Sequence, residues 1–157
     1  MKNLILLAAF VLCSCATTET QILHISDTFS PGVQAWDEDI VRWSQEYDLD
    51  PDLIAVVMEL ESGGDVNYRG GRGQLGLFGI MPYWFMRNQN PLDPDTNASV
   101  ALPYLVKCYT MAGGDIRITL IGNNGGVGAI GRNELALAQE TIDYASLGEY
   151  LYNERNP

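Results

Sequence analysis

The stretch that decides the fold is Asp50-Pro51-Asp52-Leu53-Ile54-Ala55-Val56-Val57-Met58-Glu59-Leu60-Glu61-Ser62-Gly63-Gly64. Its first two residues predict a helix start, because aspartate is a good N-cap and proline fits the first helical turn. Its last two residues predict the end of the helix, since glycine readily adopts the backbone conformation that terminates one. Most residues in between are apolar, so we expect a core-facing stripe along this helix.

One carboxyl group, that of Glu61, stands at the end of this helix and on its apolar side. The residues three, four and seven positions earlier share its face, and all are apolar: Met58, Val57 and Ile54. A carboxyl held among apolar side chains favours its neutral form, with pKa increases of about 3–5 units in extreme cases. Glu61 is therefore the candidate general acid. The alternative is a glutamate that reaches solvent or caps a backbone amide.

The rest of the chain carries helical patterns separated by glycine-rich loops. The apolar spacing and the turn residues predict helices over 33–47, from about 96 to 111, over 115–121 and over 139–153. Pro103 is expected to kink or break the helix that contains it. No strand-like alternation of any length occurs. The predicted fold class is therefore mainly α, as a single domain over residues 33–157.

The composition excludes some partners before any motif is considered. The chain has 157 residues, the length of one domain, and a formal net charge of −11. Nucleic-acid binding draws on clustered Lys and Arg, and no such run occurs, so we expect no nucleic-acid partner. We also expect no metal and no cofactor. Asp48, Asp50 and Asp52 have the spacing of a calcium-binding loop, but Leu53 stands where its turn needs glycine.

Residues 1–14 are interpreted as a lipoprotein signal peptide. The apolar run over residues 4–12 is too short to cross a membrane. The following Leu12-Cys13-Ser14-Cys15 resembles the bacterial lipobox, which implies cleavage before Cys15 and lipid on its sulfur. An ordinary signal peptide or a lipid-free helix is the alternative. Residues 15–32 are then expected to form a lipid-anchored tether, with His24 at the surface. The domain is expected to be membrane-anchored in the cell envelope, on the periplasmic side in a two-membrane cell.

Five motifs, in order along the chain, resemble those of the SLT-type lytic transglycosylase domain, which has a lysozyme-like fold. The motifs are Glu61-Ser62, Gly76-Leu77-Phe78-Gly79-Ile80-Met81-Pro82, Asn97 through Leu105, Thr119 through Gly126, and Glu140-Thr141-Ile142-Asp143-Tyr144. The resemblance implies that Glu61 is the catalytic residue of a glycan cleft. It also implies a set of substrate-binding residues: Ser62, Phe78, Gly79, Met81, Asn123, Asn124, Glu140 and Tyr144.

The resemblance further implies a reaction. Peptidoglycan would be cleaved between N-acetylmuramic acid and N-acetylglucosamine, with formation of a 1,6-anhydro sugar. Glu61 would first protonate the leaving oxygen and then act as base toward the muramyl 6-hydroxyl. The implied partners are peptidoglycan glycan strands and the membrane, reached through the N-terminal lipid. Envelope-spanning machinery is a further candidate partner.

Three departures from the family pattern keep alternatives open. Gly79 stands where the family usually has glutamine, Asn123 where it has tyrosine, and Gly70 where it often has serine. These losses favour a catalytically weakened peptidoglycan-binding protein as one alternative. A hydrolytic muramidase with Asp65 as its second carboxylate is another. The aromatic run Tyr83-Trp84-Phe85 is interpreted as core packing rather than as a surface for sugar rings.

Overall fold

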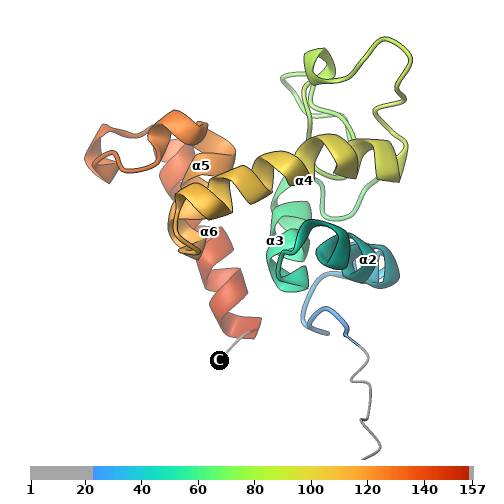
Figure 1. Cartoon of the computed structure of the whole chain (residues 1–157), viewed down its shortest axis with the longest axis horizontal. Helices are drawn as coiled ribbons and strands as arrows, with labels where there is room; N and C mark the ends of the chain where they lie inside the picture. The colour runs from blue at the N-terminus through green and yellow to red at the C-terminus, as the bar shows by residue number, and fades with distance from the viewer. Residues whose placement is uncertain (1–22, 156–157) are drawn as a thin grey trace, which may run out of the picture.

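Helices carry the fold of residues 23–155, the part of the chain that the computed structural model describes (Figure 1). The α-helices are α1 (Pro31–Gln34), α2 (Asp37–Tyr47), α3 (Pro51–Glu61), α4 (Pro94–Met111), α5 (Ile116–Gly125) and α6 (Gln139–Arg155). Short 3-10 turns lie in the loops: η1 (Pro82–Trp84), η2 (Val127–Ala129) and η3 (Glu134–Ala136). Apart from two isolated bridges at Leu75, residues 23–155 form no β-structure. The predicted mainly α class is confirmed.

Helix α4 runs across the molecule and joins its two sides (Figure 1). Helices α2 and α3 lie near its N-terminal half, together with the long loop over residues 62–93. Helices α5 and α6 lie at its C-terminal half and pack on one another, and α6 also packs on α3. No helix within residues 23–155 is long and apolar enough to cross a membrane. The predicted signal peptide and Cys15 lie outside the described residues.

The central helix α3 forms as its sequence predicts. The Asp50 side chain accepts a hydrogen bond from the Asp52 backbone N–H at 2.8 Å, and Pro51 occupies the first turn. The residues from Leu53 to Met58 are at most 3% exposed, so the helix is buried on all sides for most of its length. At its end, Gly64 approaches the backbone of α1 so closely that a Cβ there would lie 2.2 Å from the Gly32 carbonyl oxygen. The glycine is therefore required by packing as well as by the helix end.

The long loop is held by a buried amide rather than by secondary structure. Asn97 on α4 is fully buried. Its side chain donates to the carbonyl oxygens of Leu75 (3.0 Å) and Pro91 (2.9 Å) and accepts from the Phe78 N–H (2.8 Å). All three bonds of this amide go to the loop backbone, which fixes the path of a segment rich in glycine. The residues that follow, including Gly79, are placed against the end of α3 as a result.

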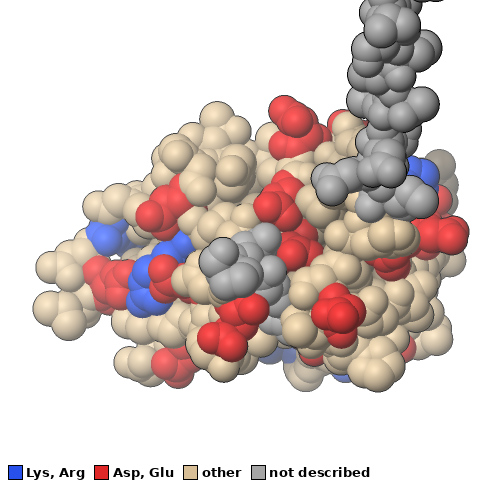
Figure 2. Space-filling model, turned by 90° about the horizontal axis from the view of Figure 1, so that it is seen from below, with Lys and Arg blue, Asp and Glu red and all other residues tan. Residues whose placement is uncertain are grey.

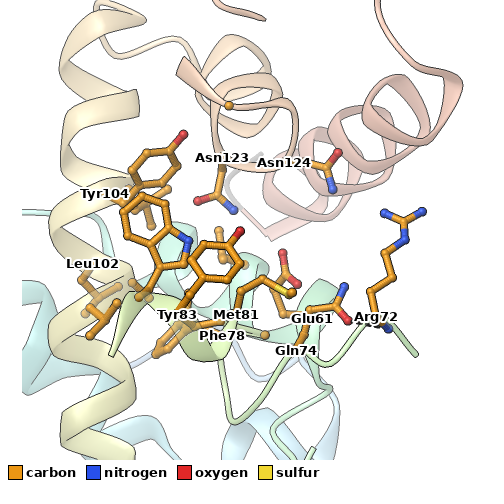
Figure 3. A pocket seen from close by; sticks show the side chains of 18 of the residues that line it. Glu61, Arg72, Gln74, Phe78, Met81, Tyr83, Leu102, Tyr104, Asn123 and Asn124 are labelled. Atoms are coloured by element: carbon orange, nitrogen blue, oxygen red, sulfur yellow. Dashed lines mark hydrogen bonds between the residues drawn. The ribbon is translucent and has the colours of Figure 1, made fainter. Parts of the chain in front are cut away.

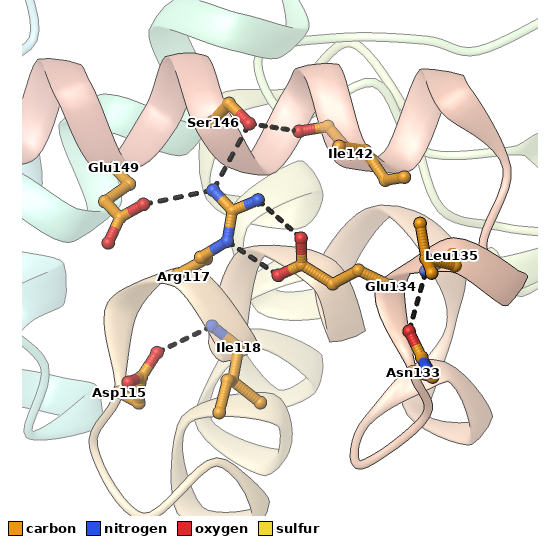
Figure 4. Close-up of polar contacts among 9 residues, drawn as sticks. All are labelled: Asp115, Arg117, Ile118, Asn133, Glu134, Leu135, Ile142, Ser146 and Glu149. Atoms are coloured by element: carbon orange, nitrogen blue, oxygen red, sulfur yellow. Dashed lines mark hydrogen bonds and ion pairs between the residues drawn. The ribbon is translucent and has the colours of Figure 1, made fainter.

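A second loop, between α5 and α6, is fixed by an ion-pair network (Figure 4). The Arg117 guanidinium donates two hydrogen bonds to Glu134, at 2.7 and 2.8 Å, and one to Glu149 on α6 at 3.1 Å. It also contacts the Ser146 hydroxyl at 3.2 Å. The Arg117 side chain is only 25% exposed, and its contact with Glu134 is bidentate, the strongest geometry for such a pair. The loop is thereby tied to α6.

The surface carries the acidity that the composition predicts. Figure 2 shows one face of the molecule with acidic side chains spread among neutral ones and few basic side chains between them. Elsewhere in the described residues, basic side chains besides Arg117 are also paired: Arg42 contacts Asp39 and Asp95, both at 2.7 Å, and Arg72 contacts Glu140. This distribution offers no basic patch on that face for a polyanion.

Several predicted helix boundaries need correction. The helix expected over 33–47 is two helices, because the chain turns at Ala35 and Trp36 and the Trp36 indole N–H donates to the Gly64 carbonyl at 3.0 Å. Helix α4 continues through Pro103 without a break. Helix α5 extends past residue 121 to Gly125, which brings the polar residues at its end to the functional site.

The predicted boundary between tether and domain at residue 33 is wrong. Ile25 and Phe29 are 6% and 4% exposed and belong to the hydrophobic core. The Ser26 backbone N–H donates to the Asp52 carboxylate at 2.9 Å, which ties this segment to the first turn of α3. Residues 25–32 are therefore part of the domain. His24 is exposed as expected, and its ring contacts the Asp37 carboxylate.

Candidate active site

A cavity of about 490 Å³ opens at the end of α3 (Figure 3). Its walls come from five places in the chain: the end of α3, the loop over residues 72–84, helix α4, the end of α5 and the start of α6. Within the cavity, Glu61 has Tyr83 and Tyr104 on one side and Arg72 on the other (Figure 3). A second hollow shares Glu61 and Glu140 with the first and continues along α6. The two hollows therefore adjoin, and Glu61 lines both.

Glu61 has the protonation behaviour of an acid/base catalyst. Burial at the end of α3 raises the pKa of Glu61 to about 7. A hydrogen bond from Tyr144 acts in the opposite direction and lowers this pKa, while the negative charge of Glu140 raises it further. Desolvation is the largest of these effects. A carboxyl with this pKa is about half protonated at neutral pH and so can both donate and accept a proton.

Two side chains from α5 and α6 hold the carboxyl. The Asn123 amide donates to the Tyr144 hydroxyl at 3.1 Å, and Tyr144 in turn hydrogen-bonds Glu61. Burial and the neighbouring Glu61 carboxylate raise the pKa of Tyr144 well above its ordinary value, so its hydroxyl stays neutral and remains a donor. Because the Asn123 amide uses one acceptor site of this oxygen, the hydroxyl proton is directed to the carboxyl.

Gly79 brings its backbone directly against the same carboxyl. It has φ +58°, in the left-handed region, and a Cβ built on it would lie 2.5 Å from Glu61 Oε2. Nearby, a Cβ on Gly70 would lie 2.4 Å from Gln74 Oε1, so the Gln74 side chain occupies the space beside that glycine. Gln74 lines both hollows together with Glu61. Gly79 thus leaves room for the Glu61 carboxyl, and Gly70 leaves room for the Gln74 amide.

The family model described as Transglycosylase SLT domain matches residues 38–144, which is more than half of the chain. The chain belongs to the SLT domain family. Its fold is accordingly the lysozyme-like fold of that family, and this SLT domain occupies most of the described residues.

Solved structures share the fold of this SLT domain at low sequence identity. One is an inactive mutant of lytic transglycosylase Slt from Pseudomonas aeruginosa, at 19% identity and a TM-score of 0.59. Another is the 70-kDa soluble lytic transglycosylase from Escherichia coli, at 18% and 0.59, and a third is a complex of a 70-kDa soluble lytic transglycosylase with bulgecin A, at 20% and 0.62. Each match covers 74% of this chain and 24% of the other chain. The chain thus matches about a quarter of the length of these proteins.

The cavity of the SLT domain collects most of the predicted site residues. Those that line it are Glu61, Phe78, Gly79, Met81, Asn123, Asn124 and Glu140. Tyr144 lines the adjoining hollow and reaches Glu61 from there. Ser62 does not line either hollow: its hydroxyl donates to the Leu77 carbonyl at 2.7 Å and accepts from the Gly64 N–H at 3.1 Å. It anchors the loop instead of facing the cavity.

The second carboxylate of the alternative two-acid mechanism is not at the site. Asp65 is exposed, lines neither hollow, and accepts a hydrogen bond from the Asn67 N–H at 2.9 Å. Glu140 does line the cavity, but it is engaged with Arg72 through two contacts of 3.1 and 2.7 Å. Within residues 23–155, no group of three His, Cys, Asp or Glu side chains is arranged to hold a metal ion.

Several residues that line the cavity were not predicted from the sequence. Tyr83 and Trp84 are 75% and 60% exposed and line the cavity, so their interpretation as core packing is wrong. Arg72 and Gln74 were not expected at the site either, although both line it. The one available signal was the group of glycines around residues 70–73, which marks a segment that runs close to other parts of the chain.

Proposed function

We propose that this SLT domain is a peptidoglycan lytic transglycosylase with Glu61 as its single acid/base. It cleaves the β-1,4 bond from N-acetylmuramic acid to N-acetylglucosamine and forms a 1,6-anhydro sugar. The observation that carries the proposal is the Glu61 carboxyl, whose pKa is raised to about 7 by burial and which lines two adjoining hollows. The relatives support it: all three are named lytic transglycosylases, and the Pseudomonas aeruginosa protein was solved as an inactive mutant in which glutamine replaces a glutamate.

The first step is donation of a proton. Protonated Glu61 gives its proton to the glycosidic oxygen as the bond from that oxygen to C1 of the muramyl residue breaks, and the electron pair stays on the oxygen. Burial is what keeps the Glu61 proton in place near neutral pH until this moment. The products of this half are a free 4-hydroxyl on the departing N-acetylglucosamine, an ionised Glu61, and a muramyl residue whose positive charge at C1 is taken up as its own N-acetyl oxygen bonds to C1.

The second step uses the same carboxylate as a base. Ionised Glu61 takes the proton of the muramyl 6-hydroxyl as that oxygen bonds to C1 and displaces the N-acetyl oxygen from it, which closes the anhydro ring and returns Glu61 to its protonated form. The Tyr144 hydroxyl stabilises the carboxylate between the two steps, since its hydrogen bond lowers the pKa of Glu61. No second enzyme carboxylate takes part, which agrees with the exposed position of Asp65.

The test is the chemistry of the products. The purified protein is incubated with peptidoglycan, and the released fragments are identified by mass spectrometry. We expect anhydro-muramyl ends from the wild type and none from Glu61→Gln. Glu59→Gln is the matched control, because Glu59 lies on the same helix, lines neither hollow, and accepts from the Ser30 hydroxyl at 2.9 Å, a bond that glutamine can keep. Reducing ends would identify a hydrolase instead, and binding without any products would identify a glycan-binding protein.

We also infer from Leu12-Cys13-Ser14-Cys15 that the mature protein carries lipid on Cys15 and is anchored in the cell envelope. The test is metabolic labelling with a fatty-acid analogue in a bacterial host, followed by membrane fractionation. Cys15→Ala should lose both the label and the membrane association. Cys13→Ala, two residues away in the same segment, should keep both. Loss of label from both variants or from neither would contradict the assignment.

A further inference from the structure

Two large aromatic side chains lie open at one edge of the Glu61 cavity. Tyr83 and Trp84 belong to η1, directly after Met81, and are 75% and 60% exposed. Aromatic side chains of this size are usually largely buried, because they contribute much of the apolar surface of a core. An exposed pair that lines a functional cavity indicates a ligand that covers it.

The pair is supported from behind. The Trp84 ring lies against the Tyr104 ring of α4, with centroids 6.4 Å apart, and against the Tyr83 ring at 5.9 Å. Tyr104 is itself fixed, because its hydroxyl accepts from the Val127 N–H at 3.0 Å and contacts the Gly122 carbonyl at 3.4 Å. A surface held in this way loses little conformational entropy when a ligand binds.

The charged side chains Arg72 and Glu140 of the cavity lie away from the aromatic pair. Arg72 and Glu140 are paired with one another, and Figure 3 shows Arg72 on the side of Glu61 opposite to Tyr83 and Tyr104. The aromatic end therefore presents ring faces and hydroxyls but no charged partner. A β-linked pyranose fits such a surface, because one face of its ring is formed by C–H groups and its hydroxyls point outward from the edge. A charged peptide finds its complementary groups at the opposite end.

We propose that Tyr83 and Trp84 form a sugar-stacking subsite, which holds an uncharged N-acetylhexosamine ring of the glycan strand on the α4 side of Glu61. This inference rests on the proposed function, because it takes the glycan strand as the ligand of the cavity. It adds the place where one sugar is held and the side chains that hold it.

Binding to a catalytically silent protein tests the subsite. The Glu61→Gln protein is titrated with chitotetraose, a β-1,4-linked N-acetylglucosamine oligomer without peptide, and followed by tryptophan fluorescence and calorimetry. Of the three tryptophans, Trp84 is 60% exposed and lines the cavity, Trp43 is 2% exposed, and Trp36 lines neither hollow and donates its indole N–H to the Gly64 carbonyl, so we attribute a change in emission to Trp84. Adding Trp84→Ala should abolish the emission change and weaken binding by about tenfold or more, since buried aromatic anchors dominate such interfaces.

Two matched variants separate stacking from a general loss of structure. Trp84→Phe keeps a ring face and should restore most of the affinity. Tyr150→Ala removes another exposed aromatic, 58% exposed on α6 and outside both hollows, and should bind as tightly as its parent. Circular dichroism and thermal unfolding establish that each variant is folded.

The outcomes for the subsite and for the proposed function are distinguishable. Unchanged affinity in folded Trp84→Ala, or no binding of chitotetraose at all, overturns the subsite. An emission change caused by free stem peptide and not by chitotetraose also overturns it. Binding of chitotetraose through Trp84 by a wild type that makes no anhydro ends supports the subsite and contradicts the proposed function. If the wild type makes anhydro ends and its Trp84→Ala variant binds chitotetraose equally well, the proposed function is supported and the subsite is overturned.

Discussion

The Gly79 backbone lies so close to the Glu61 carboxyl that a Cβ on Gly79 would be 2.5 Å from Glu61 Oε2. This contact changes the meaning of the missing glutamine at position 79. With this backbone path, the space that a longer side chain needs is taken by the acid itself, and the φ of +58° disfavours any residue with a Cβ. The glycine is therefore compatible with an intact acid.

Gly79→Ala and Gly79→Gln should both lower activity instead of raising it. The new side chain would displace the carboxyl, and the left-handed backbone adds about 1–2 kcal/mol of strain. Turnover of peptidoglycan and the unfolding midpoint are the measurements. Gly71→Ala is the control in the same loop, because a Cβ there meets nothing within 4 Å. A more active Gly79→Gln would show that the domain had been weakened by losing the glutamine.

Glu61→Gln should be more stable than the wild type at alkaline pH. The pKa of about 7 in the folded state lies above the ordinary value of 4.5, so the folded protein binds an extra proton between these pH values. The wild type therefore loses stability as the pH rises from about 4.5 to 7, and neutral glutamine avoids this loss, which is about 3 kcal/mol. Denaturant unfolding at pH 8 and pH 5 measures it. The advantage should shrink at pH 5, and an equal difference at both pH values contradicts the raised pKa.

Tyr144→Phe should move the alkaline limb of the activity profile to higher pH. The hydrogen bond from Tyr144 lowers the pKa of Glu61, whereas burial raises it. Without this hydrogen bond the pKa of Glu61 should therefore rise further. The rate should also fall, by about tenfold, because a hydrogen bond to a charged group contributes about 1.5–3 kcal/mol. The dependence of kcat/KM on pH is the measurement, with Tyr150→Phe on the same helix as the control. A shift to lower pH would be inconsistent with this role of Tyr144.

Glu140→Gln should move the same limb in the opposite direction. The negative charge of Glu140 raises the pKa of Glu61, so removing it lowers that pKa. The pair of Glu140 with Arg72 is exposed, with side chains 58% and 71% accessible, and exposed pairs contribute little to stability. We therefore expect a changed pH profile with an almost unchanged unfolding midpoint. A large fall in the midpoint would show that the ion pair is structural.

Asn97→Ala should destabilise the domain and abolish activity together. The substitution leaves the Phe78 N–H and the carbonyls of Leu75 and Pro91 without their buried partner. An unsatisfied buried group costs about 1–3 kcal/mol, and the buried Phe78 N–H is the main case, because the Leu75 carbonyl still accepts from the Ile80 N–H at 3.0 Å. Thermal unfolding and turnover are measured alongside Asn67→Ala, an exposed asparagine of the same loop. Retained activity in Asn97→Ala would mean that the loop keeps its path without this amide.

Local patterns predicted the helices and missed what depends on distant contacts. Capping residues and periodicity located α3 well, because both act within a few residues. The tether prediction was wrong because Ile25 and Phe29 are each flanked by polar residues and show no helical periodicity that would indicate burial. The prediction of core packing for Tyr83 and Trp84 was wrong for a related reason. An apolar side chain looks the same in a sequence whether it faces the core or a ligand.

The sequence by itself determined that α3 forms and that Glu61 closes it on the apolar side, since helical geometry places residues three and four apart on one face. The tertiary structure alone decided how that carboxyl behaves. Burial raises its pKa, Tyr144 from α6 directs a proton to it, and Gly79 from the long loop closes one side of it. These effects need groups that are far apart in the chain to meet within hydrogen-bond distance, and only the packed fold creates the low-polarity surroundings in which they are strong.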